Sequence, residues 1–451
     1  MIQPAQSEGP TTLARLAEMF RVAMEGLGRP VDASALERWA VVIHSSMSGR
    51  GRSYHTVEHV FTVNPGNDAI GSLAILFHDT VYCEVDGGLP RGLEAVLGDA
   101  LHVDRDHVEL RAFDPSRDVL RALVARIFGF EPGQPVTFQS GLNELASALL
   151  AVRSLESHLD LRTLAEVVTC IEATIPFRPQ EAEDLLAERL AEADREHALG
   201  LGPDGVERAV RRAVEVANRD IGNFAYDDPA AFLSHTWEIL PETNPTLRMP
   251  AYTLREYRSA MSKMEGFLSS LEASRIFRVF RGTPSGPELE AMLGRVRTNL
   301  RRGTRYLRQK VLAARLLESL AQLTGGDAPV SLFMGDLPFE ADSRRLEDLL
   351  GELPTFGEDV DEAVFRLLSE GRKKDSGFDL RHSPLAAYLY AHLGGERTDR
   401  ALEAADGWPL LTRLPQSVVV DVARATAEIA STRADALRAL ADQLEAGNAP
   451  A

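Results

Sequence analysis

Apolar residues recur at helical spacing along most of the chain. Near the N-terminus, four of them lie three or four positions apart, as on the buried face of one helix: Leu13, Leu16, Phe20 and Met24. The same periodicity returns at 119–128, 142–155, 161–174, 181–199 and 206–218. Alternating β patterns are scarce, and residues 328–334 are the best of a weak set. The pattern therefore predicts an all-α protein.

Two stretches rich in glycine and proline divide the chain. The stretch at 282–287 precedes a long helical segment that carries six arginines from Arg295 to Arg308, which we expect to pair with acidic residues of the protein. The stretch at 325–329 opens a set of short helices. Because 451 residues exceed one ordinary core, we expect three parts. They are a domain at 1–285, a basic connecting helix at 286–324, and a smaller C-terminal helical module at 325–451, which is a candidate for homo-oligomer contacts.

Composition narrows the class of protein. The formal net charge of −18 argues against a broad nucleic-acid surface or a surface for anionic membranes. Cys83 and Cys170 are the only cysteines, too few for a disulfide framework or a cysteine zinc site. No run of about 18 apolar residues is present, so we expect no membrane span. No signal peptide is evident, and we expect a cytoplasmic protein.

Four candidate metal ligands lie close together in the sequence. His55 and His59 are four residues apart, so a helix would place both imidazoles on one face. His78 and Asp79 end the apolar run 73–77, and a buried carboxylate beside an imidazole is costly unless a cation or a hydrogen-bond network satisfies it. Such ligands suit divalent cations, and a bound cation activates water and polarises a phosphoryl oxygen. A metal-centred hydrolase is the first hypothesis.

The text Tyr54-His55-Thr-Val-Glu-His59, followed by Phe77-His78-Asp79-Thr-Val-Tyr82, resembles the HD superfamily of metal-dependent phosphohydrolases. That family has a histidine, a later His-Asp doublet and a distant aspartate, all on helices. The resemblance implies an HD-domain-like helical bundle and one divalent cation (Mn, Mg, Fe, Co, Ni or Zn). It also implies a small phosphorylated substrate such as a nucleotide. The implied metal ligands are His55, His78, Asp79 and, as the distant aspartate, Asp220.

The resemblance also implies roles around the metal. His55 is preferred to His59 as the first ligand because Arg52 stands three residues before it, and His59 would then orient water or substrate. Arg52 is expected to contact a substrate phosphate. A second likeness, Asn143-Glu144 followed by Ser147-Ala148, makes Glu144 a carboxylate on the substrate side of the metal. Its position near the start of a helix explains Glu144 equally well.

Three other interpretations stay open. Members of this branch tend to carry a His-His pair where residues 171–178 have none, which favours a metal-bearing sensor or scaffold without catalysis. The string His55-Thr-Val-Glu58-His59 also matches the inverted zinc-peptidase motif, in which Glu58 would activate water, but the His-Asp doublet would be unexplained. Finally, the four residues could form a hydrogen-bonded core.

In the C-terminal module, residues 376–388 read as a polar turn and N-cap before an apolar helix.

Overall fold

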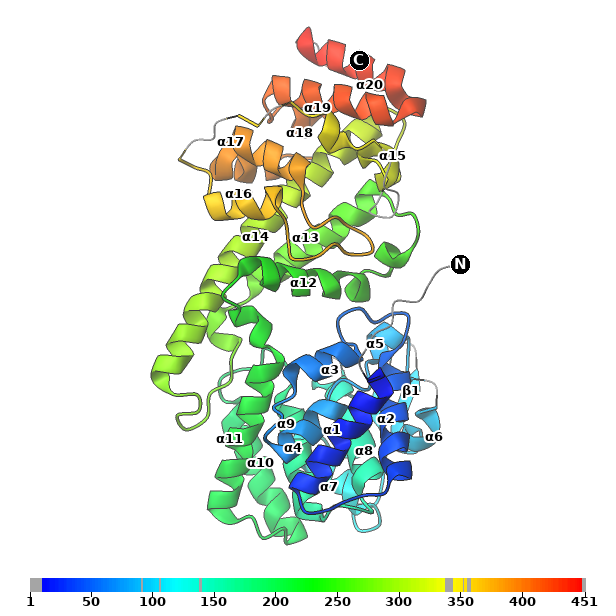
Figure 1. Ribbon diagram of the computed structural model, residues 1–451, viewed down its shortest axis with the longest axis vertical. Coiled ribbons are helices and arrows are strands. Elements are labelled where there is room, and N and C mark those ends of the chain that lie inside the picture. Colours follow the sequence, from blue (N-terminus) through cyan, green and yellow to red (C-terminus); the bar gives the residue numbers. More distant parts are fainter. Residues whose placement is uncertain are drawn as a thin grey trace. The chain divides into compact units, whose positions relative to one another are not determined.

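The protein is described by a computed structural model, which covers residues 10–90, 92–104, 107–137, 140–336, 344–351, 353–354 and 358–447. These residues are predominantly helical (Figure 1). The strands found among them are β1 (Leu101–Asp104) and β2 (His107–Leu110), which pair antiparallel, Leu101 opposite Leu110. The expectation of a mainly helical protein is therefore confirmed.

The chain forms two compact units, and neither is continuous in sequence. Unit 1 consists of Met1–Gly222 and Glu272–Leu293, and unit 2 of Asn223–Leu271 and Gly294–Ala451. This division differs from the expected domain at 1–285 and from a separate connecting helix at 286–324. Residues 223–271 belong with the C-terminal residues because Trp237 and Tyr257 both donate hydrogen bonds to the buried Asp379. Thr253 also forms an antiparallel bridge with Pro329.

Unit 1 is a bundle in which helix α4 is the most buried element. Every residue from Ile70 to Phe77 of α4 is buried, and the helix packs against α1, α3, α8, α9 and α11 (Figure 1). The helices are α1 (Thr12–Gly26), α2 (Ala33–Met47), α3 (Val57–Val63), α4 (Ala69–Phe77), α5 (Cys83–Asp86), α6 (Glu94–Leu97), α7 (Val119–Phe128), α8 (Leu142–Leu155), α9 (Leu161–Ala173), α10 (Ala182–His197) and α11 (Gly202–Asp220).

A glycine sets the approach of α11 to α4. A Cβ atom added at Gly71 of α4 would lie 3.1 Å from Cγ2 of Val216 on α11 and 2.8 Å from a carboxylate oxygen of Asp68. A larger residue would therefore push the two helices apart. Four residues beyond Val216, α11 ends at Asp220, so this close packing helps to bring Asp220 toward the residues that follow α4.

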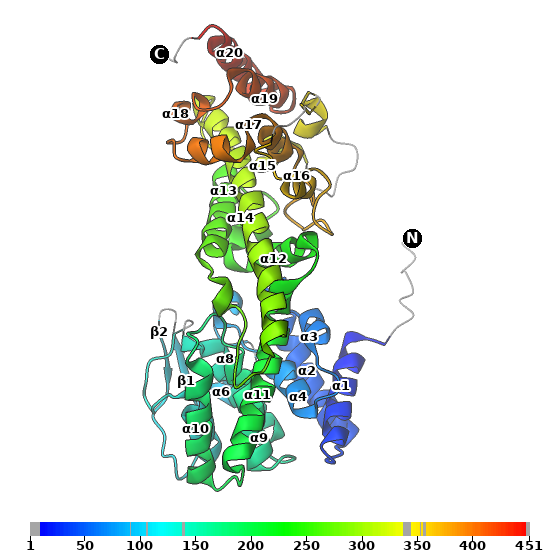
Figure 2. The ribbon, with the colours of Figure 1, turned by 90° about the vertical axis from the view of Figure 1, so that its left-hand side faces the viewer.

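Unit 2 is also helical. Its helices are α12 (Pro229–Thr243), α13 (Leu254–Ser270), most of α14 (Gly286–Leu323), α15 (Val330–Met334), α16 (Glu362–Ser369), α17 (Pro384–Leu402), α18 (Trp408–Leu411), α19 (Gln416–Ile429) and α20 (Ala434–Glu445). Its short 3-10 helices lie at Pro245–Arg248, Leu346–Leu349 and Ser431–Arg433. Another, Ala273–Arg275, belongs to unit 1, and one at Gly222–Ala225 spans the boundary in sequence between the two units. Figure 2 shows α13 and α14 side by side, where Arg258 and Glu318 form an ion pair of 2.5 Å.

Two expectations for this part of the chain meet different outcomes. The weak β pattern at 328–334 is wrong: the segment forms α15, and the apolar Val330 and Phe333 are buried three residues apart, as on one helical face. The arginines of α14 do pair with acidic residues, as expected. Arg305 and Arg308 contact Asp399 of α17 at 3.0 and 3.1 Å.

Within the described residues, no helix has the combination of length and apolarity needed to cross a bilayer.

Candidate metal centre

Four side chains from three parts of unit 1 converge on one point. His59 lies in α3, His78 and Asp79 follow α4 directly, and Asp220 is the last residue of α11. Each residue offers one potential ligand atom, and these atoms all lie within 4.8 Å of one another. The sequence placed Asp220 141 positions beyond Asp79, and the fold brings the two together.

The separations within this group match the coordination sphere of a cation. Asp220 Oδ1 lies 2.8 Å from His59 Nε2 and 3.2 Å from His78 Nε2. Asp79 Oδ2 lies 2.9 Å from His78 Nε2 and 3.7 Å from His59 Nε2. Ligand atoms held at about 2.0–2.2 Å from one metal ion lie roughly 3–3.5 Å apart. Two imidazoles and two carboxylates therefore fit a divalent cation of the borderline class.

The ring of His78 is held in one orientation. Its Nδ1 donates a hydrogen bond of 2.8 Å to the carbonyl oxygen of Ile75, one turn back in α4. Because a carbonyl can only accept, Nδ1 carries the proton and Nε2 faces the carboxylates. A hydrogen bond from the other ring nitrogen to a backbone carbonyl is typical of metal-binding histidines.

The electrostatics of the group show how strongly it needs positive charge. Burial raises the pKa of Asp220, but His78 and His59 outweigh this effect and lower that pKa to about 2. Burial likewise opposes ionisation of Asp79, yet His78 and the other nearby imidazoles hold the pKa of Asp79 far below its usual range. Burial lowers the pKa of His78, but Asp79 and Asp220 raise it well above 6.5. The two carboxylates thus retain a proton on His78, whose place a divalent cation could take.

Arg52 has a different role from the phosphate contact that the sequence suggested. Its side chain is fully buried and donates to both carboxylate oxygens of Asp86, at 3.1 and 2.7 Å. It also donates to the backbone carbonyls of His55, Asp79 and Thr80. These five bonds use all five N–H groups of a guanidinium, so Arg52 positions the segments that carry His55 and Asp79.

The structure explains two residues of the second likeness in the sequence, Asn143 and Ser147. Asn143 and Ser147 lie one turn apart on α8, and both accept hydrogen bonds from the backbone that follows the His-Asp doublet. The amide of Cys83 donates to Asn143 Oδ1 at 3.0 Å, and the amide of Val81 donates to Ser147 Oγ at 3.1 Å. All four groups are buried, so each bond satisfies a donor that water cannot reach. Helix α8 thereby fixes the chain beyond Asp79.

Glu144 has an unusual proton affinity. Burial, together with the charge of Asp79, raises the pKa of Glu144 to about 7 although a backbone hydrogen bond and the charges of His78 and Arg178 act in the opposite direction. A carboxyl group with that pKa can both hold and release a proton near neutral pH. Its electrostatic interaction with Asp79 and His78 shows that Glu144 lies near the four residues, and its position on the substrate side stays a prediction.

His55 lies next to the group but is not one of its four members. Helix α3 begins only at Val57, so His55 precedes it and does not share a helical face with His59. The imidazole of His55 packs edge-on against Tyr54 and Tyr82, with ring centroids 4.8 and 4.6 Å apart. Its charge still lowers the pKa of Asp79. Coordination by His55 stays a prediction, while His59 occupies a position that a ligand could fill.

The structure argues against the inverted zinc-peptidase interpretation, because Glu58, which would activate water, lies at the surface. The side chain of Glu58 is 68% exposed and forms an ion pair of 3.0 Å with Arg15. Glu58 is thus engaged at the surface, whereas the zinc-peptidase motif needs it beside the metal.

Comparisons of the chain with protein-family models, with curated proteins and with solved structures found no match.

The raised pKa of Glu144 predicts how the stability of the metal-free protein changes with pH. An unfolded glutamate has a pKa of about 4.3, so between that pH and about 7 the folded protein binds the proton more tightly. The contribution of Glu144 to the free energy of unfolding should therefore fall as pH rises from about 5 to about 7.5. Glu144→Gln should remove this fall, which is at least about 1 kcal/mol.

The measurement is urea denaturation of the parent and of Glu144→Gln in the presence of a chelator at both pH values. A difference in unfolding free energy between the two proteins that does not change with pH would contradict the prediction.

Proposed function

We propose that the protein is a metal-dependent phosphohydrolase of the HD type that acts on a nucleotide or another small phosphoester. The observation that carries the proposal is the convergence of His59, His78, Asp79 and Asp220 within 4.8 Å. A divalent cation held by these residues would lower the pKa of a coordinated water and polarise a phosphoryl oxygen. Two histidines and two aspartates on helices also agree with the family resemblance of the sequence.

The residues around the four ligands would have catalytic or positioning roles. Glu144, with a pKa of about 7, is suited to take a proton from the attacking water at neutral pH. His55 is partly exposed next to these four residues, and it remains the additional metal ligand that the family resemblance implies. Arg52 and Asn143 would keep the His-Asp corner in place.

A metal-bearing sensor without catalysis is the second candidate, and one observation favours it. The sequence predicts that Arg52 contacts a substrate phosphate, but all its donors are used within the fold. Arg178, another arginine of unit 1, donates to both carboxylate oxygens of Glu172 at 2.5 and 2.9 Å. Arg52 therefore has no donor left for a substrate, and Arg178 is partly engaged.

The test begins with metal analysis of the purified protein. Nucleoside mono-, di- and triphosphates, cyclic nucleotides and simple phosphomonoesters are then offered in the presence of Mn, Mg, Fe, Co, Ni or Zn. We expect phosphoester hydrolysis that a chelator abolishes and that one of these metals restores. A protein that binds the metal but turns over none of the substrates would be a sensor. A protein that binds no metal would overturn both candidates.

A further inference from the structure

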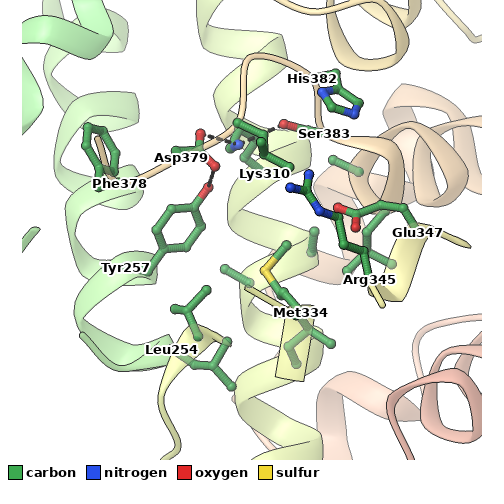
Figure 3. A pocket seen from close by; sticks show the side chains of 18 of the residues that line it. Leu254, Tyr257, Lys310, Met334, Arg345, Glu347, Phe378, Asp379, His382 and Ser383 are labelled. Carbon is green, nitrogen blue, oxygen red and sulfur yellow. Dashed lines mark hydrogen bonds and ion pairs between the residues drawn. The ribbon is translucent and has the colours of Figure 1, made fainter. Parts of the chain in front are cut away.

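Unit 2 contains a hollow whose lining residues differ in kind from those of the metal centre. It has a volume of about 670 Å³, its open mouth included, and lies among residues of α13, α14 and α17 (Figure 3). This volume includes space open to solvent, so the enclosed part of the hollow is much smaller. Most of the wall is apolar and includes Leu254, Ala313, Ala314, Leu317, Val330 and Leu385. A ligand with an apolar body would be buried favourably against this wall.

One end of the hollow carries a buried cluster of charges. Asp379 accepts hydrogen bonds from Lys310 at 2.8 Å, from Arg372 at 3.3 Å, from Trp237 at 2.8 Å and from Tyr257 at 3.1 Å. The side chains of Lys310 and Arg372 are 5% and 0% exposed. Two cations therefore share one carboxylate, and the cluster keeps one net positive charge away from water. The ring of Trp237 lies 4.1 Å from the guanidinium of Arg372 and 5.3 Å from the ammonium of Lys310 and compensates part of this charge. An anion in the hollow would compensate the rest.

Lys310 presents part of this charge to the hollow. Its ammonium group bonds to Asp379 and, at 2.7 Å, to the hydroxyl oxygen of Ser383. An ammonium group has three donors, and no third acceptor is found among the residues that the structure describes. Both Lys310 and Ser383 line the hollow, and Figure 3 shows them together at its polar end.

Ser383 and His382 add hydrogen-bonding capacity at the same end. Although the sequence suggested a helix cap here, Ser383 makes no capping bond to α17. Its hydroxyl oxygen instead accepts a hydrogen bond from Lys310 at 2.7 Å and lies 3.5 Å from the hydroxyl of Tyr306. Nδ1 of His382, which also lines the hollow, is buried without a hydrogen-bond partner in the described structure. Buried polar atoms are seldom left without a partner, so Nδ1 of His382 points to a ligand that supplies one.

Other charged residues at the hollow do not reverse its character. Arg345 and Glu347 both line it and offset each other in formal charge. Asp336 lies in an exposed position, where water screens its charge. The excess at the buried end is a single positive charge, which matches a monoanion better than a doubly charged phosphate.

We propose that this hollow is a binding site for a small amphipathic carboxylate. The carboxylate group accepts hydrogen bonds from Lys310 and Ser383, and the hydrocarbon body lies against the wall formed by α13, α14 and α17. This inference concerns unit 2 alone and does not depend on the phosphohydrolase proposal.

Calorimetric titration of the full chain with octanoate tests the proposal. We expect saturable binding with one site per chain, and at least about tenfold weaker binding of 1-octanol and of octylamine, because neither carries a negative charge to meet Lys310. Octanoate that fails to saturate the protein, or that binds no more tightly than 1-octanol, would overturn the proposal.

Two variants locate the site, and a third is their control. Met334 lines the hollow without touching the charged cluster, so Met334→Trp should fill the space and weaken octanoate binding at least about tenfold. Met249 is 59% exposed and is not part of the hollow, so Met249→Trp should bind octanoate like the parent. Lys310→Met should remove the preference for octanoate over 1-octanol. If Lys310→Met does not fold, Met334→Trp still decides: unchanged affinity in that variant would refute the assignment.

Discussion

The double variant His78→Ala/Asp79→Ala is expected to purify without the cation that we expect the parent to carry, and to lose at least about a thousandfold in phosphoester hydrolysis. The two residues supply half of the candidate ligand set, and both contact Asp220 or each other within 3.2 Å. Their removal leaves His59 and Asp220, too few protein ligands for a typical catalytic site. Metal analysis and phosphate release, measured on both proteins side by side, check the two parts of this expectation.

A matched control separates loss of the metal from general damage. Glu58 lies one residue before His59 but is exposed, so Glu58→Gln should keep both the metal and the activity of the parent. The same variant distinguishes a phosphohydrolase from a peptidase, which would need Glu58. Equal metal content in the parent and in His78→Ala/Asp79→Ala would mean that the cation is bound elsewhere, and the centre proposed here would be withdrawn.

Arg52→Met should destabilise unit 1 by about 3–5 kcal/mol, because it leaves the carboxylate of Asp86 buried without its cationic partner. The variant also removes the donors to the carbonyls of His55, Asp79 and Thr80. The slowest amides of α4 should then exchange with solvent hydrogen more than about a hundredfold faster than in the parent. Hydrogen exchange followed by mass spectrometry, with a chelator present in both samples, isolates this effect from metal binding.

Arg15→Met is the corresponding surface change. Arg15 also pairs with a carboxylate, that of Glu58, but both side chains are exposed, so the loss should be no more than about 1 kcal/mol. If Arg52→Met exchanged no faster than Arg15→Met, Arg52 would not be holding the His-Asp corner, and a role in contact with substrate would regain support.

The sequence was sufficient to predict the helical class and most of the convergent residues. His78, Asp79 and Asp220 could be singled out because each ends an apolar helical run, where a polar side chain is delivered to a pocket. The choice between His55 and His59 as first ligand stays a prediction, but its structural premise was wrong for a local reason. One helix through both residues was expected, whereas α3 starts at Val57. The start of a short helix depends on packing that spacing alone does not reveal.

Other features could not be predicted from the sequence because they depend on contacts between distant residues. The role of Arg52 is set by Asp86, 34 positions away, and by the carbonyls around Asp79. The charged cluster of unit 2 joins Lys310 to Asp379, which the sequence separates by 69 positions. Neither pairing leaves a periodic pattern in the chain. The return of the chain from unit 2 to unit 1 at Glu272, and its second departure after Leu293, likewise depend on contacts between distant residues.

The interleaving of the two units has a consequence for biosynthesis. Arg278 belongs to the segment that returns to unit 1, where the side chain of Asn218 bonds to its backbone amide and carbonyl at 2.6 and 2.9 Å. The ribosome therefore makes α12 and α13 before it releases the last piece of the N-terminal bundle. A truncated product that stops at Gly222 would leave the amide group of Asn218 without these partners, so a single cut at Gly222 does not yield a complete unit 1.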